Sequence, residues 1–163
     1  MPIRSSSADG STGAARFALD IPPTQGSHYP EPFAARVKGR IKRRLGDAFG
    51  LANIGINLVT LGPGSASSVH HRHSVQDEFV YVLSGEIVLV DDGGEQLLHP
   101  GMCVGFPAGG TAHHLVNRSA AEACYLEVGD RLPGDSGIYP DDDLEAVRTD
   151  QGWLFRHKNG DPY

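Results

Sequence analysis

The sequence has little of what marks secreted, disulfide-rich or membrane proteins. Only two of its 163 residues are cysteines, Cys103 and Cys124, whereas small secreted domains rely on several disulfide pairs. We therefore expect two buried thiols from a reducing compartment, with a disulfide between them as the alternative. The N-terminal segment contains no long apolar run, which argues against secretion and against membrane insertion. These features predict a cytoplasmic protein.

Positive charge is also scarce. Lys and Arg number 14 against 20 Asp and Glu, and the formal net charge is -6. Binding to phosphate backbones favours an excess of basic residues, so this balance argues against a nucleic-acid partner. One basic run, KGRIKRRL, spans residues 38–45. We interpret this run as a solvated segment leading into the domain, with a polyanion site as the less favoured alternative.

Glycine and proline, by contrast, are plentiful, with 21 and 11 residues. They separate short apolar runs, a pattern typical of an all-β barrel or sandwich. The predicted strands are 54–61, 69–73, 78–83, 86–90, 95–99, 103–106, 113–117 and 123–128. Strands at this regular spacing, without an internal duplication, predict an all-β fold with one jelly-roll barrel.

The segments on either side of these strands differ in composition. Residues 1–30 are rich in Ser, Gly, Pro and Ala, which predicts an irregular N-terminal arm, mobile or ordered only against a partner subunit. Residues 31–130 would form the barrel together with its lead-in, a helical or irregular segment over 29–51. Residues 131–163 would be a C-terminal tail that packs on the barrel or in a subunit contact, because an exposed Trp153 would be a sticky patch.

Four side chains of the metal-binding type lie among the predicted strands. His71 and His73 are two residues apart, so in a strand both would point to the same face and could bind one ion. Glu78 opens the next apolar run and His113 opens a later one. Three imidazoles and a carboxylate at the ends of strands predict a metal site inside the barrel.

These residues resemble the two sequence motifs of the cupin superfamily. The first motif is matched by Gly64, His71, His73, Glu78 and Gly85. The second motif is matched by Gly101, Pro107, Gly109, His113 and Asn117. The resemblance covers residues 54–128 and is closest to small single-domain bacterial cupins. It implies a small β-barrel with the metal bound inside, usually in a homodimer.

The sequence departs from the first motif at one spacing. The gap from Gly64 to His71 is one residue longer than in the motif, and His70 would fit that count. However, Arg72 stands where a histidine paired with His70 would be needed. We therefore assign His71 and His73 as the first two ligands.

The second motif leaves a choice between two adjacent histidines, because its turn is also one residue longer than usual. Strand alternation puts His113, Leu115 and Asn117 on one face, and His114 with Val116 on the other. The family spacing to Asn117 also selects His113. We predict His113 as the last ligand, with His114 as the alternative.

Such a nitrogen and oxygen ligand set suits one divalent transition metal, which could be Fe, Mn, Ni, Co, Cu or Zn. Four protein ligands leave coordination positions open for a small molecule. The leading hypothesis is therefore an enzyme of the dioxygenase or isomerase type that acts on a small oxygen-rich substrate. The alternative is a non-catalytic cupin that binds or senses a small ligand.

Residues for proton transfer are harder to find. Glu127 is a possible cavity acid, although a solvent-facing residue fits the pattern equally well, and Asn57 and Arg72 are possible polar groups at the pocket rim. Tyr81 is expected to pack rather than to act in catalysis. The acidic run 141–143 predicts a hydrated loop or helix cap rather than a cation site.

A homodimer is the expected assembly. Phe79 and Tyr81 alternate with the side chains predicted to face the barrel interior, so they would form an apolar outer face. Pairing two barrels would cover such faces and protect exposed strand edges.

Overall fold

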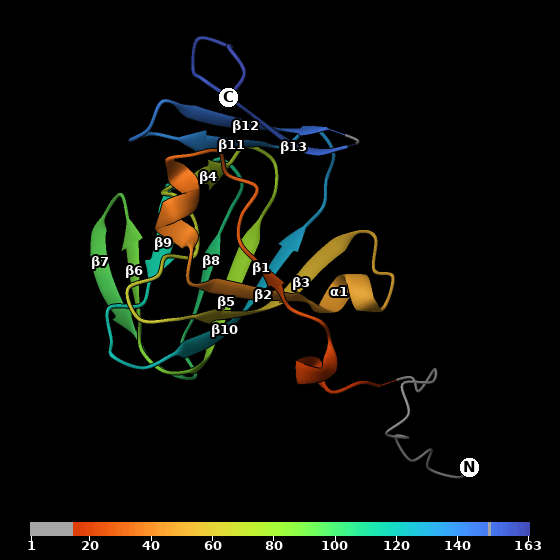
Figure 1. Cartoon of the computed structure of the whole chain (residues 1–163), viewed down its shortest axis with the longest axis vertical. Helices are drawn as coiled ribbons and strands as arrows, with labels where there is room; N and C mark the ends of the chain where they lie inside the picture. The colour runs from red at the N-terminus through yellow and green to blue at the C-terminus, as the bar shows by residue number, and fades with distance from the viewer. Residues whose placement is uncertain (1–14, 150) are drawn as a thin grey trace.

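Three antiparallel sheets make up the computed structural model, which describes residues 15–149 and 151–163 (Figure 1). The strands are β1 Thr24–Gln25, β2 Arg40–Arg44, β3 Ile54–Leu61, β4 Arg72–His73, β5 Glu78–Ser84, β6 Ile87–Asp91, β7 Gly94–Leu98, β8 Cys103–Phe106, β9 His113–Val116, β10 Ala123–Asp130, β11 Ser136–Tyr139, β12 Leu144–Thr149 and β13 Gly152–Arg156. The short helical segments are η1 Ala18–Asp20, η2 Phe33–Val37 and α1 Leu45–Ala48. No helix in these described ranges is long and apolar enough to cross a membrane.

The largest sheet has six strands in the order β1-β2-β3-β10-β5-β8. Its strands have one buried and one open face, as β5 illustrates. Val80 and Val82 are buried, whereas Phe79 and Tyr81 remain 42% and 39% exposed. Successive side chains of a strand point to opposite faces. The sheet therefore packs its inner face on the core and leaves an apolar outer face open.

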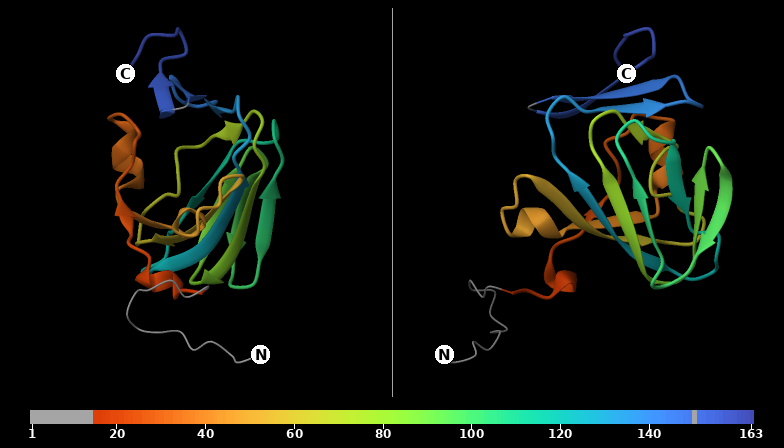
Figure 2. Two further views of the ribbon diagram at one scale, coloured as in Figure 1. Left: turned by 90° about the vertical axis from the view of Figure 1, so that its right-hand side faces the viewer. Right: turned by 180° about the vertical axis from the view of Figure 1, so that it is seen from behind.

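The second sheet, in the order β7-β6-β9, faces the inner side of the first. Ile87, Leu89 and Leu115 from this sheet share one core with Val59 and Tyr125 from the larger sheet. Figure 2 shows the two sheets as opposing walls. This arrangement confirms the predicted all-β jelly-roll fold.

The third sheet, in the order β13-β12-β11-β4, lies across one end of the barrel, at the top of Figure 1. Its buried side carries Tyr139, Leu144 and Ala146, which pack with Phe33 and Val69 in a second core. Three of its strands come from residues 131–163, where the sequence predicted a packed tail without naming strands. The short β4 ties this sheet to the first pair of predicted metal ligands.

A glycine of the first motif has a clear structural reason. Gly85 adopts φ 76° in the turn between β5 and β6, where the chain passes from one sheet to the other, and L side chains rarely adopt this conformation. A Cβ atom at this position would lie 2.7 Å from the Cα of Ala123. The motif therefore requires glycine here so that the turn can approach β10.

The lead-in prediction was wrong over its basic run. Residues 29–51 were expected to be helical or irregular, but Arg40–Arg44 forms β2, which pairs along its whole length with β3. The strand was missed because Ile41 is its only apolar residue, so no alternation of apolar side chains marks it. Part of the N-terminal arm is ordered without a partner subunit, because Thr24 and Gln25 pair with β2 of the same chain.

The prediction of two buried cysteines was also wrong. Both thiols are free, Cys103 is exposed and Cys124 is half-buried. Cys103 pairs with Tyr81 across β8 and β5, so its side chain lies on the open outer face. Its neighbour Val104, not Cys103, takes the inward position opposite Val80.

Candidate metal centre

The two sequence motifs are joined by a backbone bridge between His71 and His113. The N–H of His71 donates to the carbonyl of His113 at 3.1 Å, and the N–H of His113 donates to the carbonyl of His71 at 2.7 Å. His73 follows in β4, and Glu78 begins β5. Residues about forty positions apart in the chain are thus brought side by side by the fold.

Three of the predicted ligands form a cluster of suitable geometry. One ligand atom from each of His71, His73 and Glu78 lies within 4.8 Å of the others. The two Nε2 atoms of His71 and His73 are 3.2 Å apart, and His73 Nε2 lies 3.8 Å from Glu78 Oε2. Two ligands bound at about 2.1 Å to one ion are separated by about 3.0–3.4 Å. The separation of the two histidine nitrogens falls in this range, and the glutamate oxygen lies about 0.4 Å beyond it, so the three groups could hold one ion after a small movement of the Glu78 side chain.

His113 is not part of this group of three mutually close ligands, but it approaches the glutamate. Its Nε2 atom is 3.5 Å from Glu78 Oε2, and it is buried without a hydrogen-bond partner among the described residues. The imidazole stacks on Phe106 with ring centroids 3.3 Å apart. A buried, unpaired ring nitrogen that faces a carboxylate is satisfied if both bind a metal ion.

Each of the three imidazoles has a hydrogen-bond acceptor near its Nδ1 atom. Nδ1 of His71 lies 3.0 Å from the Val69 carbonyl, Nδ1 of His73 lies 2.6 Å from Asp135, and Nδ1 of His113 lies 3.3 Å from the Thr111 carbonyl. These acceptors favour a proton on Nδ1, which leaves Nε2 as the free lone pair on each ring.

Burial and neighbouring charges set the protonation of the cluster. Burial, with the nearby His73 and His113, holds the pKa of His71 well below its usual value, which favours the neutral form that binds metals. Burial also disfavours a charge on His73, but the hydrogen bond to Asp135 and the charge of Glu78 outweigh it and raise the pKa of His73. Binding of an ion would displace that proton.

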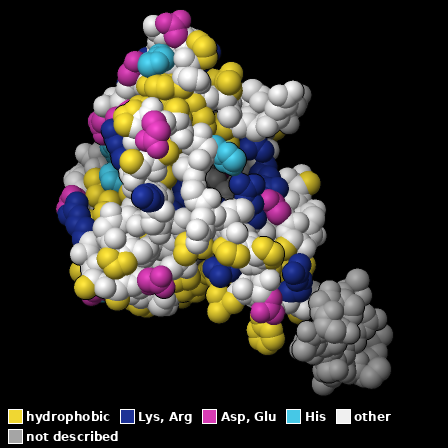
Figure 3. Space-filling view, viewed as in Figure 1, with side chains coloured by type: hydrophobic (Ala, Val, Ile, Leu, Met, Phe, Trp, Pro, Cys, Tyr) yellow, Lys and Arg dark blue, Asp and Glu magenta, His cyan; other side chains and the backbone are white. Residues whose placement is uncertain are grey.

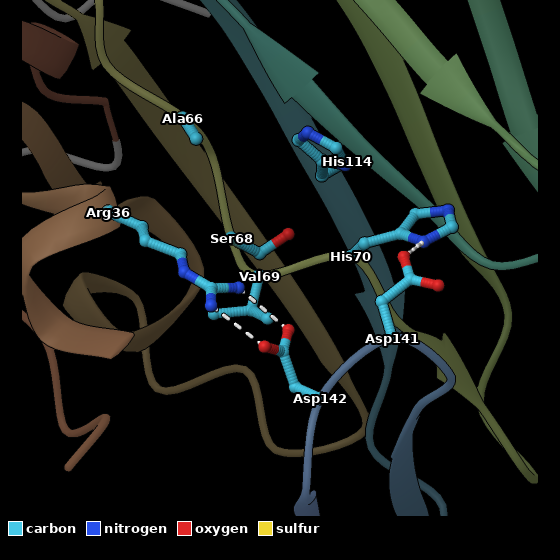
Figure 4. Close-up of a pocket in the computed structure, with 8 residues that line it drawn as sticks. All are labelled: Arg36, Ala66, Ser68, Val69, His70, His114, Asp141 and Asp142. Carbon is cyan, nitrogen blue, oxygen red and sulfur yellow. Dashed lines mark hydrogen bonds and ion pairs between the residues drawn. The ribbon is translucent and has the colours of Figure 1, made fainter. Parts of the chain in front are cut away.

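His70 and His114 lie outside the cluster, in a separate pocket of about 360 Å³ (Figure 4). Their ring centroids are 5.4 Å apart, and Nδ1 of His70 lies 2.7 Å from Asp141. Burial lowers the pKa of His114 to about 4. The strand alternation that turns His113 toward Glu78 turns its neighbour into this pocket.

The carboxylates of the acidic run 141–143 contact different partners. Asp141 contacts His70, Asp142 pairs with Arg36, and Asp143 contacts His157 and the backbone N–H of Lys158. The carboxylates thus connect a turn to other elements rather than converging on a common cation position.

The barrel interior also holds a polar group beside the metal cluster. Lys42 Nζ lies 2.7 Å from Glu127 Oε1, and Asn57 Nδ2 donates to the same oxygen at 2.9 Å. Glu127 is paired with Val80, and Glu78 is two residues from Val80 on the same strand face. Glu127 and Glu78 are therefore diagonal neighbours on the inner face.

Burial alone would raise the pKa of Glu127, but Lys42, assisted by Arg40 and Asn57, outweighs it and lowers that pKa to about 2. The sequence suggested Glu127 and Asn57 as polar cavity groups. It missed Lys42, whose inward position depends on β2, and Asp135, for which the sequence carried no signal. Arg72, by alternation with His71 and His73, belongs to the opposite face of its strand.

The fold and the metal-type cluster define a cupin, and the chain belongs to the cupin superfamily. A cupin-domain family model matches residues 57–129. A crystal structure of a sugar phosphate isomerase of the cupin superfamily from Silicibacter pomeroyi DSS-3 is 45% identical, with a TM-score of 0.87, and the match covers 91% of this chain and 96% of that one.

Two further structures extend the comparison. A candidate sugar phosphate isomerase from Acidithiobacillus ferrooxidans is 34% identical, with a TM-score of 0.69 and coverage of 74% of this chain and 77% of that one. A predicted oxalate decarboxylase from Thermotoga maritima, at 22% identity, TM-score 0.57 and coverage of 71% and 97%, shares the fold alone. No functionally curated protein matches the sequence.

Proposed function

We propose that His71, His73, Glu78 and His113 together bind one divalent transition metal ion, which could be Fe, Mn, Ni, Co, Cu or Zn. The proposal is supported by ligand-atom separations of 3.2–3.8 Å and by the unpaired, buried Nε2 of His113. Three nitrogen ligands and one oxygen ligand leave positions open on an octahedral ion.

With that ion bound, we propose that the protein is an isomerase of a small sugar phosphate. The observation that carries this proposal is the placement of a charged polar group, Lys42 with Glu127 and Asn57, inside the barrel beside the metal cluster. The 45% identity to the Silicibacter pomeroyi isomerase over 91% of the chain favours isomerisation over the dioxygenase hypothesis.

The chemistry of isomerisation suits these groups. Interconversion of an aldose and a ketose moves one proton between C2 and C1 and a second proton between the oxygens on these carbons, and it requires a polarised carbonyl. A bound divalent ion supplies the Lewis acid for that polarisation. Glu127 Oε2 has no hydrogen bond to the described part of the chain, so it is available to a substrate. The Lys42 ammonium can donate a hydrogen bond to a substrate oxygen.

The decisive experiment combines metal analysis with a substrate panel. Protein purified without chelator would be incubated with aldose and ketose phosphates in D2O, and carbon-bound deuterium would be followed by NMR. We expect interconversion with deuterium incorporation and its loss in His73→Ala. Oxygen uptake without deuterium exchange would support the dioxygenase type instead.

One observation favours a second candidate, a cupin that binds a small ligand without turnover. The pKa of Glu127 is lowered to about 2, and a carboxylate of such low basicity is a weak proton acceptor. Calorimetric binding of a sugar phosphate without deuterium exchange or conversion would identify this function.

We also propose that the protein is a cytoplasmic homodimer. The apolar outer face of β5, with Phe79, Tyr81 and Leu83 each about two-fifths exposed, supports pairing of two barrels through the larger sheet. Light scattering at micromolar concentration tests the dimer.

A further inference from the structure

Arg40 is an arginine inside the barrel without a carboxylate partner of its own. It is paired with the buried Leu61 across β2 and β3, so its side chain belongs to the inner face. Its guanidinium donates to the carbonyl of Ser67, and it forms no ion pair within residues 15–149 and 151–163. An unpaired charge in a partly buried position is costly.

Other arginines of the chain are paired in a different way. Arg118 makes a two-pronged contact with Glu95, at 2.7 and 2.6 Å, and Arg156 lies 2.7 Å from Glu145. Both pairs lie toward the surface, where an ion pair contributes little. The chain has 20 acidic residues against 14 basic ones. Arg40 therefore lacks an ion-pair partner although carboxylates are plentiful in the chain.

Arg40 lies close to the metal cluster. Ser67, whose carbonyl Arg40 binds, is followed by Ser68, and the hydroxyl of Ser68 lies 3.3 Å from Nδ1 of His71. Arg40 thus contacts the loop that carries the first ligand. The charge of Arg40 also acts on the buried Tyr125, as does the charge of Glu78, so both groups face the same interior.

Lys42 approaches the interior from the same strand. Lys42 is paired with the buried Val59. Because it lies two residues after Arg40 in the strand, it shares the inner face with Arg40. Its ammonium has three donors and uses one on Glu127. Glu127 is thus paired with Lys42, while the guanidinium of Arg40 on the same wall has no carboxylate in direct contact.

The face drawn in Figure 3 shows a hollow between the β12–β13 layer and the β2–β3 side of the molecule. Lys and Arg side chains gather at this hollow beside a histidine, with an acidic side chain next to them, although the chain as a whole is acidic. Clefts lined by one sign of charge concentrate ligands of the opposite sign.

We propose that Arg40, together with Lys42, forms an anion subsite that binds the phosphate group of a ligand whose other end reaches the metal centre. The planar guanidinium fork matches the geometry of a phosphate and forms charge-assisted hydrogen bonds with it. The basic run of residues 38–45 thus contains a strand, β2, whose inward side chains select a phosphorylated substrate. This inference rests on the proposed function. It assigns recognition of the substrate's phosphate group to Arg40 and Lys42.

The test measures binding of inorganic phosphate to protein loaded with Mn2+. Calorimetry gives the affinity, and broadening of the phosphorus-31 resonance by Mn2+ reports whether the anion lies near the metal. We expect Arg40→Gln to weaken phosphate binding by about tenfold or more, with unchanged Mn2+ content. The matched control is Arg43→Gln, which removes the same charge from the outward face of the same strand and should change the affinity by less than about twofold.

Equal phosphate affinity in the wild-type protein and in Arg40→Gln would overturn the subsite, as would no binding to the wild-type protein at about 10 mM phosphate. If Arg40→Gln does not fold, Arg40→Lys decides the question. It keeps the charge but loses the fork, so we expect binding weakened by about threefold or more, and an unchanged affinity contradicts the proposal.

A separate assay distinguishes this inference from the proposed function. Fructose 6-phosphate and fructose are compared as ligands and as substrates in D2O. Arg40-dependent preference for the phosphorylated sugar without deuterium exchange would retain the subsite and reject the isomerase. Deuterium exchange that does not depend on Arg40 would retain the isomerase and reject the subsite.

Discussion

Asp135 accepts a hydrogen bond from Nδ1 of His73 at 2.6 Å, and its side chain is completely buried. The second carboxylate oxygen accepts hydrogen bonds from the backbone N–H groups of Val75 and Gln76, at 2.9 and 3.3 Å. The carboxylate therefore fixes both the ring of a candidate ligand and the loop that follows it. Such carboxylate–histidine contacts orient metal ligands in many proteins.

We predict that Asp135→Asn lowers metal affinity by about 10–100-fold. The amide oxygen can keep the bonds to Val75 and Gln76, but the amide nitrogen then faces Nδ1 of His73. That ring would place its proton on Nε2 and lose the lone pair needed for the metal. Competition with a chromophoric chelator measures the affinity.

The control for this variant is Asp141→Asn. Asp141 contacts Nδ1 of His70 at 2.7 Å in the same manner, but His70 lies in the separate pocket outside the cluster. This variant should bind the metal with wild-type affinity. Equal losses in the two variants would show that Asp135 has no special relation to the metal centre.

The fold was largely predictable, because periodicity in the sequence reports on side chains that face a core. Val80 and Val82 alternate with Phe79 and Tyr81, and that alternation marks β5 from sequence alone. By contrast, β2 faces a polar interior through Arg40, so its inner face gives no apolar signal. The three strands after residue 131 were also missed, because β11 pairs with β4, more than sixty residues earlier in the chain, and such remote pairing leaves no local signal.

The ligand positions could be proposed from sequence, because residues two positions apart in a strand, such as His71 and His73, point to the same face. The supporting groups could not be proposed, because they come from remote segments. Asp135 lies 62 residues from His73 and Lys42 lies 85 residues from Glu127. Only the folded chain brings such pairs together, and no local pattern of residues anticipates them.

Glu127 should determine part of the acid sensitivity of the protein. Its pKa is lowered from the model-compound value of 4.5 to about 2, so its ionised form stabilises the folded state above pH 4.5. That contribution is lost as the pH falls toward 2. We predict that Glu127→Gln lowers the free energy of unfolding by about 2–4 kcal/mol at pH 7, since Lys42 loses its partner.

The difference between wild type and Glu127→Gln should therefore shrink between pH 4.5 and pH 2. Urea denaturation of the metal-free proteins at several pH values measures it. Glu86→Gln, at an exposed position, provides the control and should follow the wild-type curve. A constant difference across this pH range would contradict the assignment.

The proposed dimer places the outer face of β5 in the interface. Tyr81→Glu introduces a charge among apolar side chains, so we predict dissociation to a monomer at micromolar concentration, equivalent to an increase of about 100-fold or more in the dissociation constant. Light scattering coupled to gel filtration measures the mass.

Leu97→Glu is the matched control, because Leu97 is similarly exposed, at 45%, but lies on the smaller sheet. A wild-type monomer would refute the dimer itself, and dissociation by both variants would refute the choice of face.

The adjacent histidines of β9 provide the sharpest test of the metal centre. His113 Nε2 lies 3.5 Å from Glu78, whereas His114 shares its pocket with His70. We predict that His113→Gln reduces metal affinity by about 100-fold, and that His114→Gln leaves it within about twofold.

Both substitutions remove an imidazole from the same strand, so a general loss of stability would affect both variants. Thermal melts of the metal-free proteins detect such a loss. Metal content after dialysis against a weak chelator measures the outcome. Retention of metal by His113→Gln with loss from His114→Gln would place the fourth ligand on the other face of the strand.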